Sequence, residues 1–177
     1  MQIKASVSFN QYLRLLFGLA YRKPIMILLL SIALLLVMWI VTFNFHLLLL
    51  PAPVYYQYLT LSLILFIQPL VIYITIRRNY FSSNHLKEKL AIEFTNDEIK
   101  IRGDSFYTTL IWMKTYKVVE LEKWYLIYQN TLSAILIPKK SFEVGQEQEF
   151  KAMLKSIKGI KLHLANKTIT LKEKDIV

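Results

Sequence analysis

The sequence predicts an α+β protein in which a membrane-spanning helical hairpin precedes a small antiparallel β-domain with one covering helix. Residues 25–76 contain no Lys, Arg, Asp or Glu and hold two long apolar runs. From about residue 89 the chain changes to short alternating segments separated by turn residues, a pattern typical of antiparallel strands. One amphipathic helical stretch, residues 146–158, follows these strands.

The two apolar runs, Ile25–Phe43 and Tyr58–Ile76, each contain 19 residues. As helices they would each span about 28 Å, close to the hydrocarbon thickness of a bilayer. Neither run has the polar face that a helix on a soluble core would show. We therefore expect a hairpin over residues 25–78, with transmembrane helices at about 25–45 and 56–77.

Basic residues flank this hairpin on both outer sides. Residues 1–24 contain four basic and no acidic residues, and residues 77–90 contain four basic residues and one acidic residue. The linker Asn44–Gln57 contains no Lys or Arg. By the positive-inside rule, both termini are expected in the cytoplasm, in a multi-pass protein of the cell (inner) membrane. The net charge of +10 thus indicates topology, and we expect no nucleic-acid partner.

Residues 1–24 form an amphipathic segment before the first run. Ser8 and Gln11 fit the capping-box pattern of a helix start. Polar residues then recur at about every fourth position, on an otherwise apolar helix. Two interpretations are open: the helix lies in the cytoplasmic headgroup region, or it packs on the hairpin or the β-domain. Residues 2–8 alternate weakly and are compatible with a short strand.

The predicted β-domain covers residues 86–159. The six expected strands are Leu90–Phe94, Glu98–Arg102, Phe106–Trp112, Tyr116–Leu121, Trp124–Tyr128 and Leu132–Ile137. Their close spacing indicates an antiparallel meander that curls into a half-barrel or folds into two packed sheets. The helix at 146–158 carries one apolar stripe that should cover an open side of the sheet, and Gly159 is its expected C-cap. Residues 160–177 are expected to form a Lys-rich tail or a terminal hairpin.

The sequence contains no motif for enzyme chemistry. The chain has no cysteine, and its three histidines share no spacing with carboxylates that would form a metal site. Its four glycines form no phosphate-binding loop. We therefore predict a protein that is not an enzyme and that has no metal or cofactor.

Two regions are candidates for function. Lys139, Lys140 and Trp124 are a candidate interaction surface for lipid phosphates or an acidic partner, although a solvated turn and a core tryptophan would explain the same residues. Gln68, next to Pro69, is a candidate intramembrane polar site. The alternative is a mild kink in which Gln68 bonds a freed carbonyl or the partner helix.

Several stretches of the predicted β-domain resemble the YcxB-like family of bacterial membrane proteins. These stretches are Phe94–Ile99, Leu110–Trp112, Val118–Glu120, Tyr125–Tyr128 and Ala134–Phe142. Together with the hairpin and its amphipathic leader, the resemblance spans about residues 5–158. It implies a C-terminal domain similar to a small pleckstrin-homology (PH) domain, and it implies no catalytic residue.

We expect from this evidence a non-catalytic, membrane-tethered module. Its cytoplasmic PH-like domain would bind a partner protein or lipid headgroups at the inner leaflet. The alternative is a subunit of a small oligomeric channel or transporter with a regulatory cytoplasmic domain. The expected partners are the lipid bilayer and a cytoplasmic or membrane protein, with further copies of the chain as an open alternative.

Overall fold

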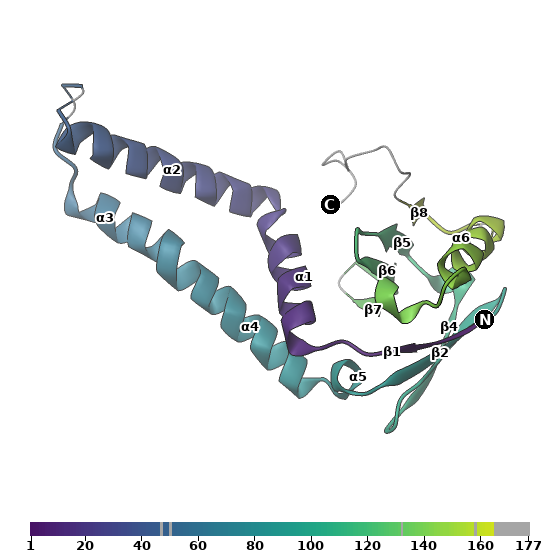
Figure 1. The fold of residues 1–177 in the computed structure, drawn as a ribbon. Helices are drawn as coiled ribbons and strands as arrows, with labels where there is room; N and C mark the ends of the chain where they lie inside the picture. The colour runs from purple at the N-terminus through teal and green to yellow at the C-terminus, as the bar shows by residue number, and fades with distance from the viewer. Residues whose placement is uncertain (47, 50, 132, 158, 165–177) are drawn as a thin grey trace. The chain divides into compact units, whose positions relative to one another are not determined.

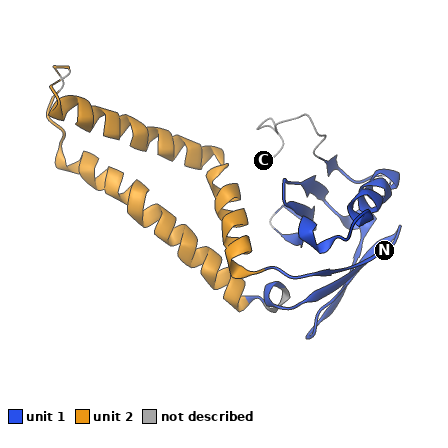
Figure 2. Cartoon of the chain, in the orientation of Figure 1, with its two compact units in different colours: residues 1–7, 83–177 blue, residues 8–82 orange. Residues whose placement is uncertain are grey.

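The fold is described from a computed structural model that covers residues 1–177 except 47, 50, 132, 158 and 165–177 (Figure 1). The chain divides into two compact units (Figure 2). The first unit combines residues 1–7 with residues 83–177, and the second consists of residues 8–82. The second unit is therefore an insertion between two segments of the first.

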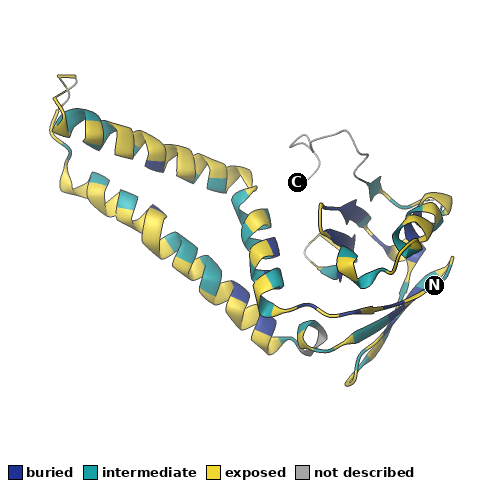
Figure 3. Ribbon diagram, in the orientation of Figure 1, coloured by how far each residue is buried: buried dark blue, intermediate teal, exposed yellow. Residues whose placement is uncertain are grey.

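The second unit is helical. Its elements are α1 (Phe9–Tyr21), α2 (Pro24–Asn44), α3 (Tyr55–Ser62), η1 (Leu63–Ile67) and α4 (Gln68–Ser82). Among the described residues, two helices are long and apolar enough to cross a membrane. One has 21 residues, and the other has 28 residues and runs through α3, η1 and α4. Most of their side chains are exposed (Figure 3). The second helix continues beyond the expected end near residue 77, to Ser82.

A single turn of π-helix, η1, interrupts the second long helix. Pro69 follows it, and a proline ring clashes with the carbonyl four residues earlier and offers no N–H. The helical turn contains one extra residue at this point, so that the Gln68 N–H donates to the carbonyl of Leu63, five residues earlier. The local irregularity expected from Gln68 and Pro69 is thus a π-bulge.

Helix α1 packs on α4 within the second unit. Tyr12 and Leu15 are buried, and the Phe9 ring lies 5.4 Å from the Tyr80 ring. At its start, the Ser8 N–H donates to Gln11 Oε1 at 3.2 Å, which is one half of the expected capping box. The segment thus packs on the second long helix, as one interpretation predicted, and a place in the headgroup region stays a prediction.

The first unit contains a four-stranded antiparallel sheet in the order β1-β2-β3-β4. Its strands are β1 (Gln2–Ala5), β2 (Leu90–Phe94), β3 (Glu98–Arg102) and β4 (Tyr107–Ile111). Period-2 alternation places Ile3, Ile92, Ile99 and Ile101 in the core. The weak alternation near the start of the sequence therefore forms a genuine strand of the domain.

A 3-10 turn, η2 (Trp112–Lys114), ends this sheet and leads into a second one. The Trp112 side chain is buried, and its indole Nε1–H donates to the Thr95 carbonyl at 2.8 Å. The strand expected to run through Trp112 therefore stops at Ile111. The meander was expected to form either a half-barrel or two packed sheets, and the strands are divided between two sheets.

The second sheet has the order β7-β6-β5-β8. Its strands are β5 (Lys117–Glu120), β6 (Trp124–Tyr128), β7 (Ala134–Pro138) and β8 (Leu162–His163). Strand β8 pairs with β5 in parallel, so part of the stretch expected as a tail or terminal hairpin joins the second sheet. The expected terminal hairpin would pair this region with residues 168–171, which lie outside the described residues.

Helix α6 (Gln146–Ser156) covers the core where the two sheets meet, and it ends two residues before the expected end at 158. Its Phe150 side chain is fully buried. The Phe150 ring lies 4.7 Å from that of Phe94 in the first sheet and 5.1 Å from that of Tyr125 in the second. The apolar stripe of this helix thus joins both sheets into one core. Short turns, α5 (Asn84–Lys87) and η3 (Lys139–Ser141), complete the unit.

Strands β1 and β2 are neighbours in the sheet although the whole helical unit separates them in the sequence. Ile3 pairs with Ile92, and Ala5 pairs with Leu90. Ile3 and Ala5 are 3% and 2% exposed, so β1 is part of the core. The expected domain bounds, 86–159, omit this strand.

A soluble chain that joins residues 1–7 to residues 83–177 through a flexible linker of about ten residues should fold as one unit. Residues 83–177 alone should be less stable by about 3 kcal/mol or more, because they lose the buried Ile3 side chain and the β1 ladder. Urea unfolding followed by circular dichroism measures the difference. Equal stability of the two chains would contradict the assignment of β1 to the core.

Candidate functional site

A buried carboxylate lies between β5 and α6 in the first unit. Glu120, at the end of β5, has a side chain that is only 2% exposed. Its Oε1 accepts from Lys139 Nζ at 2.5 Å and lies 2.7 Å from Lys151 Nζ. Two cations therefore surround one buried anion, which is the condition under which a carboxylate is tolerated inside a protein.

A second carboxylate completes the cluster. Glu147 Oε1 lies 3.4 Å from Lys139 Nζ and 3.3 Å from Lys151 Nζ. The Tyr125 hydroxyl donates to the same oxygen at 2.9 Å, and Lys139 Nζ lies 5.1 Å from the Tyr125 ring centre. We call Glu120, Tyr125, Lys139, Glu147 and Lys151 the Glu120 cluster. It has two acids and two bases, so its formal net charge is zero.

The pKa values follow from this geometry. Burial raises the pKa of Glu120, but hydrogen bonds and charge from Lys139 and Lys151 outweigh burial and leave that pKa lowered. Burial also raises the pKa of Glu147 and lowers that of Lys151. Their hydrogen bonds and opposite charges outweigh burial, so that the pKa of Glu147 is lowered and the pKa of Lys151 is raised. The pKa of the Tyr125 hydroxyl is raised, first by burial and then by its hydrogen bond to Glu147. All four groups keep their ordinary charge at neutral pH, so the cluster holds α6 on the second sheet.

The structure brings the predicted interaction residues to one end of the second sheet. Trp124 begins β6 and pairs with Pro138, which immediately precedes Lys139 and Lys140. Trp124 is only 8% exposed, and Lys139 belongs to the Glu120 cluster. Lys140 is exposed. Of the three predicted residues, Lys140 offers the most accessible contact to a partner.

The other members of the Glu120 cluster were not singled out from the sequence. One signal was present, because Glu120 lies two residues after Val118 in the same strand and so shares its inward face. Val118 is fully buried, and Glu120 is 1% exposed. An acid at an inward strand position predicts a buried partner, but not which lysine supplies it.

Gln68 lies in the second unit, at the start of α4. Its Nε2 donates to Met26 Sδ, in α2, at 2.6 Å. Its Oε1 is buried and has no hydrogen-bond partner among the described residues. The side chain therefore joins the two long helices, as the structural alternative for this residue predicted.

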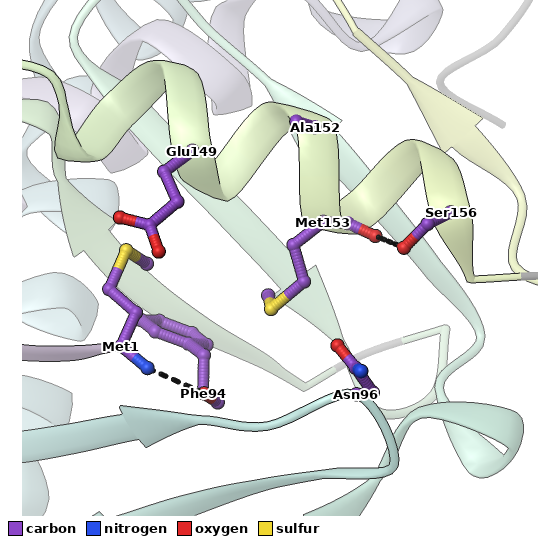
Figure 4. A pocket seen from close by; sticks show the side chains of 7 residues that line it. All are labelled: Met1, Phe94, Asn96, Glu149, Ala152, Met153 and Ser156. Atoms are coloured by element: carbon purple, nitrogen blue, oxygen red, sulfur yellow. Dashed lines mark hydrogen bonds between the residues drawn. The ribbon is translucent and has the colours of Figure 1, made fainter.

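A pocket of about 340 Å³ lies between the end of β2 and α6, in the first unit (Figure 4). Its polar lining includes the Glu149 carboxylate and the Asn96 side chain, and its apolar lining includes Phe94 and Met153. The Ser156 hydroxyl at its edge donates to the Met153 carbonyl at 2.7 Å. No side chain lining this pocket is positioned as a base for that hydroxyl, so we assign it no reaction.

The Glu120→Gln variant should be less stable at pH 7 by about 2 kcal/mol, because two lysines lose their buried counter-charge but keep Glu147 and partial access to water. In thermal unfolding of the full chain in detergent, followed by tryptophan fluorescence, the midpoint should fall by roughly 10 °C. Folding lowers the pKa of Glu120 below its ordinary value of 4.5. The wild-type protein should therefore be more stable than the variant above pH 4.5, and this difference in stability should disappear as the pH falls below that value.

Glu98→Gln is the matched control for this prediction. Glu98 Oε1 lies 3.1 Å from Lys100 Nζ, but both side chains are about one-third exposed. An exposed pair of this kind contributes little to stability, so the midpoint should hardly change. Equal effects of the two substitutions would show that the burial of Glu120 is not what matters.

Comparison with known proteins identifies one family. The YcxB-like protein family matches residues 94–154, which run from the end of β2 into α6. No curated protein and no solved structure matches the chain. The matched region contains every member of the Glu120 cluster but neither β1 nor the helical unit. Residues 94–154 are therefore similar to the YcxB-like protein family, within the stretch of residues 5–158 over which the resemblance was expected.

Proposed function

We propose that this protein is a non-catalytic, membrane-tethered module whose strand domain binds a partner protein. One observation carries the proposal: the two long apolar helices are inserted between β1 and β2, which are adjacent strands of one sheet. Both ends of the insertion therefore return to the same folded domain. A hairpin of two spans is the simplest membrane arrangement that meets this condition.

The surface of the helical unit supports the membrane part of the proposal. In α2, only 6% of the most apolar 18-residue stretch is buried. In the second long helix, only 11% of the corresponding stretch is buried. An exposed apolar surface of this length is costly in water and suits the hydrocarbon core of a bilayer. With basic residues on both outer flanks, the strand domain would lie on the cytoplasmic side of the inner membrane.

The surface of the strand domain favours a protein partner over lipid headgroups. Lys139, which was expected to contact phosphates, is neutralised within the Glu120 cluster. Large apolar side chains are instead exposed on this unit, including Met113 at 85% and Val144 at 106%. Exposed apolar groups beside charged ones are typical of protein interaction surfaces. A PH-like fold of this domain is part of the proposal and rests on the family resemblance.

A channel or transporter subunit is the alternative proposal. It would use Gln68, whose Oε1 is buried without a partner among the described residues. The bond from Gln68 to Met26 makes this side chain a contact between two helices, which a tether also needs. The tether therefore explains more of the described structure.

Crosslinking from the full chain in its membrane tests this proposal. A photoreactive amino acid placed at Lys140 or Val144, both exposed, should give adducts of protein mass. The same probe at exposed Asp104, in the turn between β3 and β4, serves as the control. Adducts with lipid alone would favour headgroup binding, and no adduct at either position would contradict an interaction module.

A further inference from the structure

Strand β4 ends the first sheet, and half of its backbone groups point away from β3. The Gly103 N–H donates to the Phe106 carbonyl, and the Trp112 N–H donates to the Asp97 carbonyl. In an antiparallel ladder, hydrogen-bonded and non-hydrogen-bonded pairs alternate. With the observed register, residues 106, 108, 110 and 112 therefore bond β3. The N–H and C=O groups of Tyr107, Thr109 and Ile111 face outward, along the edge of the sheet. The Ile111 carbonyl also accepts from the Thr115 hydroxyl at 3.5 Å and keeps a second lone pair for a partner strand.

This edge lacks the protection that natural edge strands usually have. Charged side chains, prolines and bulges commonly prevent edge-to-edge pairing. Tyr107–Ile111 reads Tyr-Thr-Thr-Leu-Ile and contains no charge and no proline. The side chains of Tyr107 and Ile111 are 56% and 42% exposed, and Thr109 between them is also exposed. Aromatic and β-branched residues of this kind favour strand pairing.

We propose that β4 pairs in antiparallel fashion with β4 of a second copy of this chain, centred on Thr109. In this register the outward groups of Thr109 face those of Thr109 in the other copy, and those of Tyr107 face those of Ile111. About six backbone hydrogen bonds form. Each Tyr107 lies opposite an Ile111, which is an aromatic and β-branched pair that stabilises antiparallel sheets.

The directly opposed side chains favour this register over the two neighbouring ones. In the centred register Tyr107 of each copy lies opposite Ile111 of the other, and Thr109 lies opposite Thr109. A register shifted by two residues in either direction would set Thr109 against Tyr107 or against Ile111, and it would lose one strand pair. The strand therefore pairs best with its own sequence in the opposite direction, and this argues for a second copy as its occupant.

The absence of cysteine from the sequence allows a direct test of this register. Full-length chains carrying Thr109→Cys should form a disulfide-linked dimer in membranes under mild oxidation. Tyr107→Cys alone and Ile111→Cys alone should not, because each would lie about 14 Å from its own equivalent, too far for a disulfide. Mixing the Tyr107→Cys and Ile111→Cys chains should restore the link. Val144→Cys, fully exposed outside the strand, is the collision control.

A charge variant gives a second readout. Thr109→Lys places two ammonium groups opposite each other at the centre of the pair and leaves the bonds to β3 in place. It should reduce the mixed Tyr107→Cys and Ile111→Cys link on the order of tenfold. Unchanged elution of this variant in size-exclusion chromatography, apart from the dimer, would show that the chain still folds.

Three results would overturn the inference. They are the absence of a Thr109→Cys dimer, equal linking at Val144→Cys, and self-linking of Tyr107→Cys, which would indicate a parallel pair. No Thr109→Cys dimer would form if the edge paired only with other proteins, or if another segment of the same chain occupied it. The inference does not rest on the proposed partner binding, because loss of the β4 link leaves adducts at Lys140 unaffected.

Discussion

The pairing of β1 with β2 is the constraint on which the rest of the structure depends. These strands are adjacent in the sheet, yet residues 8–82, the whole helical unit, separate their two chain segments in the sequence. The helical unit must therefore begin and end at neighbouring points of one folded domain. Strand β1 also contributes two buried side chains, Ile3 and Ala5, so the domain is complete only when both of its segments are present.

The YcxB-like region holds its parts together in two ways. Phe150 of α6 contacts aromatic rings from both sheets, which provides apolar cohesion. The Glu120 cluster adds fixed charge pairs between the second sheet and the same helix. Buried ion pairs contribute little net stability but are costly to break singly, so the cluster specifies where α6 docks. Lys139 therefore serves the fold, whereas its neighbour Lys140 is exposed.

Much of the local structure could be predicted from the sequence. The charge-free runs gave both long helices, and alternation located β2, β3 and β6 to the residue. The start of α6 at Gln146 also followed from its apolar stripe. These features depend on neighbouring residues, whose hydrophobic pattern is visible directly.

The non-local features could not be predicted in the same way. Strand β1 has only four residues and finds its partner beyond the helical unit, so no local pattern reveals the pairing. The break at Trp112 depends on an indole bond to Thr95, and β8 depends on parallel pairing with β5. For the candidate surface, the sequence located Lys139, in the turn η3, but not its partner Glu120, at the end of β5. In each case the deciding contact joins residues that are distant in the sequence.

The most direct test of the account is the side of the membrane on which β1 and the strand domain lie. Three full-length variants each carry one cysteine: Lys4→Cys in β1, Leu48→Cys between the long helices, and Asp104→Cys after β3. All three positions are exposed, and the natural chain has no cysteine. In intact cells, a membrane-impermeant maleimide should label only position 48, and all three should react after permeabilisation. Labelling of positions 4 and 104 on opposite sides would contradict the pairing of β1 with β2 around a two-span hairpin.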